Sequence, residues 1–239
     1  MQLPAYPSLL FLVFILVLMP LGARRTAARL RSPGAAPVSR ILYWRSGVIT
    51  QLFILLLAWG VGRGFGYGIF VLSAPTVRDI GGAAAALVLV FLLRELSNRT
   101  RSESERRSLE VYKRAPRTPT ERAWFVAAAL TASVAEEAAY RGVGFSILWY
   151  SLGNGWVAGL VMAIAFALAH WNQGWKSGVT ILLVAAILQV LVVMTNTLVL
   201  AMIVHAVYDL AVGFLIARRA ARYDGEAAQQ DGEAAPANA

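Results

Sequence analysis

The chain has 239 residues, of which 58% are hydrophobic, a formal net charge of +9 and no cysteine. The absence of cysteine excludes a thiol nucleophile, a disulfide framework and a zinc site with Cys ligands. A mean hydropathy of +0.61, together with several apolar stretches of about 18 or more residues, predicts a polytopic membrane protein and excludes an ordinary soluble domain.

The apolar stretches predict an all-α membrane helix bundle of about seven transmembrane helices. The expected spans are about 7–23, 46–62, 79–96, 122–150, 154–171, 177–195 and 197–217. The first span differs from a cleaved signal peptide, because Arg24 and Arg25 follow the apolar run and no Lys or Arg precedes it. We therefore expect the first span to be retained.

Basic residues gather in alternate loops of the predicted bundle. Segment 24–45 holds six arginines and no acidic residue, and segment 94–122 holds nine basic residues against five acidic ones. The turns near 151–155 and 195–197 carry no charge. The positive-inside rule therefore predicts an N-out/C-in topology in the cell membrane. This distribution accounts for the net charge by topology, so we expect the lipid bilayer and no nucleic acid as a partner.

Three details of the loops and termini can be predicted. Segment 97–121 is interpreted either as a cytoplasmic loop with a short amphipathic helix on anionic lipid or as a solvated linker. Thr120, followed by Glu121, is interpreted as the start of the fourth span. The polar sequence after residue 219 predicts a disordered tail.

Ionisable residues away from the ends of the predicted spans occur only in the fourth, fifth and seventh spans. They are Glu136, Glu137, Arg141, His170, His205 and Asp209, and they include both histidines of the chain. A charged side chain at the centre of a bilayer costs about 2.5–3.5 kcal/mol on insertion scales, so such residues are functional candidates. Counting helix rise from the uncharged turns predicts that the three spans place these residues in one layer, about 14–22 Å from those turns. This layer lies toward the cytoplasmic side.

The spacing of the first three residues predicts two different environments. Glu137 and Arg141 are four residues apart, with the acid N-terminal, which favours an ion pair on one helix face. Glu136 points about 100° away from Glu137 and faces a different neighbour. Taken alone, the pair has a structural alternative, and each histidine is interpreted equally well as a packing residue. The convergence of six such residues in depth favours a functional site.

Three short motifs carry a resemblance to a known family. The motifs are EEAAYR at 136–141, FALAH at 166–170 and HAVYD at 205–209. In order and spacing they resemble the signatures EExxxR, FxxxH and HxxxN or HxxxD of the CAAX-protease and bacteriocin-processing (CPBP, or Abi) family of intramembrane proteases. The resemblance covers about residues 120–217. It implies an intramembrane endopeptidase that hydrolyses a peptide bond of a membrane-associated peptide or protein.

The resemblance also implies roles for the six residues. Glu136 would activate water, and His170 would hold the water or the developing oxyanion. His205 would complete the oxyanion site with Asp209. The ion pair of Glu137 with Arg141 would support these groups.

One residue departs from the pattern of the CAAX-processing members. They usually carry Asn in the third motif, where this chain has Asp209. An ionised Asp cannot donate a hydrogen bond to an oxyanion, whereas a protonated Asp can, and an ionised Asp can orient His205 as an acceptor. Prenylated CAAX substrates are therefore less favoured than other membrane-associated peptides.

The sequence leaves an alternative open both for the cofactor and for the function. Two His with Glu and Asp could ligate zinc, but the helix spacing of HExxH zinc proteases is absent, so a glutamate-activated water with no metal or other cofactor is favoured. Buried Glu, His and Asp also form proton relays. A proton-coupled transporter and a catalytically silent membrane scaffold are therefore the alternatives to a protease.

The resemblance suggests a division of the chain into three parts. Residues 1–118 are expected to form N-terminal transmembrane helices and basic cytoplasmic loops. Residues 119–219 are expected to form the catalytic helix bundle, and residues 220–239 a disordered cytoplasmic tail.

Overall fold

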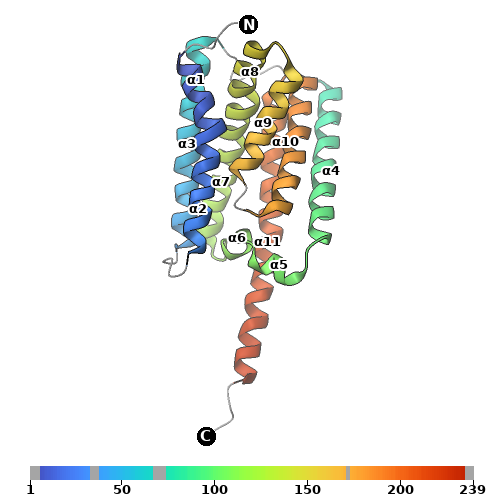
Figure 1. Ribbon diagram of the computed structural model, residues 1–239. Coiled ribbons are helices and arrows are strands. Elements are labelled where there is room, and N and C mark those ends of the chain that lie inside the picture. Colours follow the sequence, from blue (N-terminus) through green and yellow to red (C-terminus); the bar gives the residue numbers. More distant parts are fainter. Residues whose placement is uncertain (1–5, 33–37, 67–73, 171–172, 235–239) are drawn as a thin grey trace.

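The computed structural model describes residues 6–32, 38–66, 74–170 and 173–234, which are mostly helical and contain no strand. The long helices run side by side in one elongated bundle, with α5 and α6 at one end and α11 projecting beyond that end (Figure 1). The elements are α1 Tyr6–Val13, η1 Phe14–Leu18, α2 Met19–Arg31, α3 Arg40–Phe65, α4 Val77–Arg99, α5 Glu103–Ser108, α6 Glu110–Lys113, α7 Pro119–Glu136, η2 Glu137–Gly144, α8 Phe145–Leu152, α9 Gly155–Ala169, α10 Trp175–Thr195 and α11 Leu198–Ala234.

Apolar helices of membrane-spanning length confirm the predicted class, an all-α polytopic helix bundle. Within the described ranges, five segments are long and apolar enough to cross a membrane, and α9 is a shorter apolar helix. The five are Tyr6–Arg29, Arg40–Gly64, Val77–Arg99, Trp175–Thr195 and Leu198–Glu226. The chain is therefore a multi-pass membrane protein. Crossing by α9 and by the α7–η2–α8 segment, which would make seven spans, stays a prediction, as does the N-out/C-in topology.

The segment that carries the two adjacent glutamates is one helical path with a π-helical centre. Helix α7 begins with a capping box, in which the Thr118 side chain accepts from the backbone N–H of Glu121 and the Glu121 side chain accepts from that of Thr118. The cap is therefore Thr118 and not Thr120, because this reciprocal pair requires a spacing of three residues. The π-helix η2 follows directly, and such π-helical turns occur often at functional sites.

Segment 97–121 packs beneath the bundle, which neither interpretation of its sequence predicted. It contains α5 and α6, and Tyr112 and Ala115 form a small buried cluster with Ala217 and Ala220 of α11. Burying these apolar groups against α11 removes them from water, so the segment is held against the protein itself.

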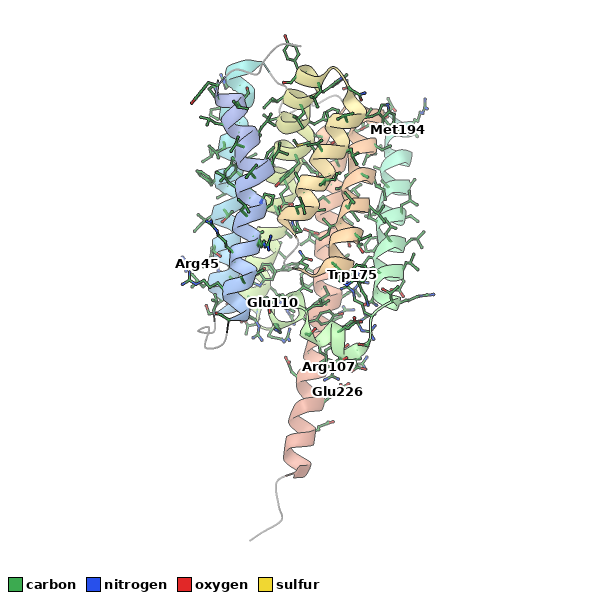
Figure 2. All side chains as sticks on the ribbon, viewed as in Figure 1. Arg45, Arg107, Glu110, Trp175, Met194 and Glu226 are labelled. Atoms are coloured by element: carbon green, nitrogen blue, oxygen red, sulfur yellow. The ribbon has the colours of Figure 1, made fainter. Side chains whose placement is uncertain are left out.

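The C-terminal tail was predicted to be disordered, whereas in the structure α11 continues through Ala234. Two ion pairs hold this extension to the preceding segment, Arg107 with Glu226 and Arg117 with Asp224, each at 2.6 Å. Figure 2 shows Arg107 and Glu226 together where α11 leaves the bundle. Composition alone does not reveal such partners from a distant segment. Residues 235–239 lie outside the described ranges, and the other two divisions of the chain stay predictions.

Candidate active site

Glu137 is the centre of a buried polar cluster. Its side chain is fully buried, and its Oε1 lies 3.0 Å from Nη1 of Arg141 and 2.9 Å from Nδ1 of His205. The guanidinium of Arg141 also lies over the ring of Phe166, 4.3 Å from the ring centroid. Because Glu137 neutralises Arg141 and also holds His205, it joins the first motif to the third across two helices.

Glu136 is buried and faces a different set of groups, as the helix geometry predicted. Nε2 of Gln51, on α3, donates a hydrogen bond to Oε1 of Glu136 at 2.6 Å. Nε2 of His170 lies 3.9 Å from Oε1, and Nε2 of His205 lies 3.9 Å from Oε2. The carboxylate of Glu136 therefore lies among one amide and two imidazoles that come from three other parts of the chain.

The hydrogen bonds of the two histidines determine which ring nitrogen carries a hydrogen. Nδ1 of His170 lies 2.8 Å from the backbone oxygen of Phe166, and a carbonyl oxygen only accepts, so this Nδ1 is the donor. Nδ1 of His205 donates in the same way to the carboxylate of Glu137. In a neutral imidazole the other nitrogen, Nε2, then presents a lone pair, and in both rings Nε2 faces Glu136.

Asp209 lies at the edge of the cluster. Its Oδ2 is 3.5 Å from Nε2 of His205, and its side chain is 35% exposed. Since Nδ1 of His205 is already held by Glu137, Asp209 is a second carboxylate at the opposite nitrogen of the same ring.

A cavity of about 600 Å³ opens beside these residues. Its wall includes Glu136, Gln51, His170, His205 and Asp209, whereas the ion pair of Glu137 and Arg141 is not part of it. The wall continues to a basic end formed by α4 and the segment after it, with Arg94, Asn98 and Arg101. There the guanidinium of Arg101 donates to Oγ of Ser177 at 3.0 Å, and burial lowers the pKa of Arg101. A cavity of this size holds water and a short stretch of peptide.

The six residues chosen from the sequence therefore come together. Glu137 contacts Arg141 and His205, and Glu136 lies near His170 and His205. Asp209 lies next to His205. Their proximity is a finding, while their chemical roles stay predictions.

The comparisons agree with the resemblance found in the motifs. Residues 118–211 match the family model described as type II CAAX prenyl endopeptidase Rce1-like. Over this segment the chain is similar to the CAAX-protease family. No curated protein and no solved structure matches the chain. The matched segment contains all six candidate residues, and the family it resembles is one of proteases.

Gln51 lies outside the family-matched segment and was missed in the sequence. We expected nothing from the first three spans to join the polar layer, because only ionisable residues were considered. An uncharged Gln in an apolar helix costs less to insert than a charge, so its signal in the sequence is weaker. The signal that could have identified it is its place in the middle of the apolar run from 46 to 62.

The donor set was also compared with the needs of a zinc ion. Zinc requires three or four nitrogen or oxygen ligands that converge at about 2.0–2.2 Å. Among the residues that the structure describes, no group of three or more His, Cys, Asp or Glu side chains is arranged to hold a metal ion. The side chains as arranged do not fit zinc, so no step below passes through a metal.

Proposed function

We propose that the chain is an intramembrane endopeptidase that hydrolyses a peptide bond of a membrane-associated peptide or protein with a water activated by Glu136. The observation that carries this proposal is the position of the Glu136 carboxylate, 3.9 Å from Nε2 of each histidine in the wall of the cavity. Water held by hydrogen bonds of about 2.8 Å fits between two polar atoms at this separation.

The first step proposed is attack by water on the scissile carbonyl carbon. Glu136 takes a proton from the water as the new carbon–oxygen bond forms, which is general-base catalysis. His170 presents the lone pair of Nε2 on the same side as Oε1 of Glu136, so it accepts the second hydrogen of the water and orients the molecule.

The second step is the collapse of the tetrahedral intermediate. The attack of water leaves the carbonyl oxygen as an oxyanion, which His205 stabilises as a donor when Nε2 carries a proton, and in the collapse this oxygen forms the carbonyl again. Glu137 holds Nδ1 of that ring, so the position of Nε2 is set before substrate arrives. Glu136 then gives its proton to the leaving nitrogen as the carbon–nitrogen bond breaks, which leaves a carboxylic acid and an amine.

The cavity supports an extended substrate. It connects the Glu136 carboxylate with the basic end at Arg94 and Arg101, and an extended chain advances about 3.3 Å per residue. We place the active-site layer toward the cytoplasm because the basic loops gather at the end of the bundle where α5, α6 and the extension of α11 lie.

The test compares wild type with Glu136→Gln and Glu136→Ala in detergent, using a library of membrane peptides and mass spectrometry. The library contains peptides ending in a prenylated CAAX sequence and unprenylated peptides with an apolar anchor. Both variants should lose about 10²–10⁴-fold in cleavage rate, the size of a general-base contribution. The matched control is Glu95→Gln, which changes a half-exposed glutamate on α4 and should cleave like wild type.

Each outcome of this experiment has a definite reading. Cleavage that disappears in both Glu136 variants supports the protease, and the peptides consumed name the substrate class. Cleavage that a chelator abolishes would contradict the metal-free mechanism. Equal product profiles for all four folded proteins would contradict proteolysis by Glu136 and favour the scaffold, and proton-coupled uptake into vesicles would favour the transporter.

A further inference from the structure

Gln51 makes the shortest contact to the carboxylate that is proposed to activate water, and it comes from a helix outside the family-matched segment. Nε2 of Gln51 donates to Oε1 of Glu136 at 2.6 Å. We propose that Gln51 is a positioning residue for Glu136, which fixes the orientation of the carboxylate that takes the proton from water. The inference rests on the proposed function.

The direction of the hydrogen bond supports this assignment. An ionised carboxylate only accepts, so the amide of Gln51 must turn its NH₂ group toward Glu136. The bond therefore occupies Oε1 in the ionised form, which is the form that acts as a base. No hydrogen bond from a described residue reaches Oε2, which faces Nε2 of His205 at 3.9 Å. Oε2 is thus the less engaged oxygen of the base.

The other half of the Gln51 amide shows that stability alone does not explain this residue. Its Oε1 is buried and has no hydrogen-bond partner among the described residues. A buried acceptor without a partner is destabilising, whereas an apolar side chain of similar size at this position would leave nothing unsatisfied on α3. The contact to Glu136 is the one gain that the amide provides, and it acts on the carboxylate that lines the cavity.

Helix α3 is a rigid support for this contact. Ile54 and Ala58 on the same helix are fully buried in the main apolar core. Gly47 lies close to α7, since a Cβ there would be 3.9 Å from Cβ of Ala128. Figure 1 shows α3 and α7 side by side along the bundle. A group on a packed helix holds its partner within a narrow range of positions, which catalysis requires.

The chain contains a matched control for Gln51. Gln189 on α10 is also buried, and both polar atoms of its amide lack a partner among the described residues. It does not belong to the wall of the cavity. Replacing either glutamine with leucine removes an amide that has a buried, unpartnered oxygen from a membrane helix, but only the change at Gln51 removes a contact to Glu136.

The test measures kcat and KM for wild type, Gln51→Leu, Gln51→Asn and Gln189→Leu. The probes are two internally quenched peptides, one ending in a prenylated CAAX sequence and one unprenylated with an apolar anchor. Gln51→Leu should lower kcat about 10–100-fold and leave KM within about threefold, because misplacement of a reacting group by about 1 Å costs rate and not binding. Gln51→Asn, whose amide is one methylene shorter, should lower kcat in the same way.

Gln189→Leu should leave kcat unchanged and should unfold at or above the temperature of wild type, because it removes two buried polar atoms that have no partner among the described residues. An unchanged kcat in Gln51→Leu, or an equal loss in Gln189→Leu, would overturn the assignment.

A second measurement needs no substrate, so it separates failure of this inference from failure of the proposed function. The infrared carboxylate bands of Glu136 are obtained as the difference between each protein and the same protein with Glu136→Gln. Gln51→Leu should shift these bands, because it removes the donor to Oε1, and Gln189→Leu should not. If the wild type cleaves neither probe, the proposed function fails for these substrates, and the bands still decide the role of Gln51. Unshifted bands in Gln51→Leu would overturn it.

Discussion

Nδ1 of His205 lies 2.9 Å from Oε1 of Glu137, the same oxygen that lies 3.0 Å from Nη1 of Arg141. This contact joins η2 to α11, and the two residues that form it are 68 positions apart in the chain. Glu137 therefore does more than neutralise Arg141, because it also sets the orientation of the imidazole that faces Glu136. Support for metal ligands and catalytic histidines commonly takes this form.

Replacing Glu137 should strongly destabilise the protein. Glu137→Leu leaves Arg141 charged, buried and unpaired, which costs about 3–5 kcal/mol when one partner of a buried pair is removed. The double variant Glu137→Leu/Arg141→Met removes both charges and should recover much of that loss. The free energy of unfolding of each protein in detergent tests this prediction. Equal destabilisation in the single and double variants would show that the unpaired charge is not the cause.

Replacing Asp209 should matter less than replacing His205. Glu137 already holds the imidazole at Nδ1, so the 3.5 Å contact of Asp209 at Nε2 is not needed to orient the ring. Asp209→Asn should change kcat by less than about tenfold, whereas His205→Gln should lower it about 10²–10³-fold, the size of one lost oxyanion donor. Cleavage kinetics of the best library peptide provide the measurement. A larger loss in Asp209→Asn than in His205→Gln would contradict this ranking.

An added methyl group at Gly144, at the end of η2, should destabilise the bundle. A Cβ at this position would lie 2.6 Å from Cδ1 of Ile15 and 2.8 Å from the backbone oxygen of Ala139. The backbone cannot move away as a side-chain end can, so Gly144→Ala should cost about 1–3 kcal/mol. The control is Gly81→Ala on α4, where nothing lies within 4 Å and alanine favours the helix by about 0.5–1 kcal/mol. Thermal unfolding compares the two variants, and an equal effect at both positions would refute the packing argument.

The attachment of α5 to α10 should weaken in acid. Hydrogen bonds from the Lys176 side chain and from the backbone N–H of Ser102 lower the pKa of Glu105. Because the folded-state pKa is the lower one, the stabilisation is complete above the unfolded-state value of about 4.3 and is lost as pH falls through the folded-state pKa. Hydrogen exchange of the α5 amides, corrected for intrinsic rates, should therefore accelerate over that range.

Glu105→Gln isolates the contribution of this one group. Arg107 lowers the pKa of nearby Glu103, and this effect is the same in wild type and variant. The difference between the two pH profiles therefore reports Glu105 alone. Identical profiles would show that protonation of Glu105 does not control the attachment of α5.

Predictions based on helix periodicity and on the cost of burying charge succeeded for the family-matched segment. The different directions of Glu136 and Glu137, about 100° apart, follow from 3.6 residues per turn. The meeting of His170 and His205 near Glu136 follows from similar depths in parallel helices. Both arguments concern regular helices that cross a bilayer of known thickness. Counting residues along such helices is enough to predict the direction and the depth of a side chain.

Predictions failed where a distant segment supplies the partner. In the extension of α11, Glu226 and Asp224 form ion pairs with Arg107 and Arg117 of a distant segment. Segment 97–121 lies against α11 because Tyr112 finds an apolar surface there. Local composition of either segment favours solvent, and neither contact is visible until both segments are in place.

By itself the sequence determined the class of the protein, a multi-pass helical membrane protein, because apolar length and charge cost act residue by residue along the chain. It also determined the six residues of the candidate site. Tertiary structure alone decided that Gln51 binds Glu136 and that Glu137 holds His205. Such contacts depend on how whole helices rotate and pack against one another, and that is a property of the assembled bundle.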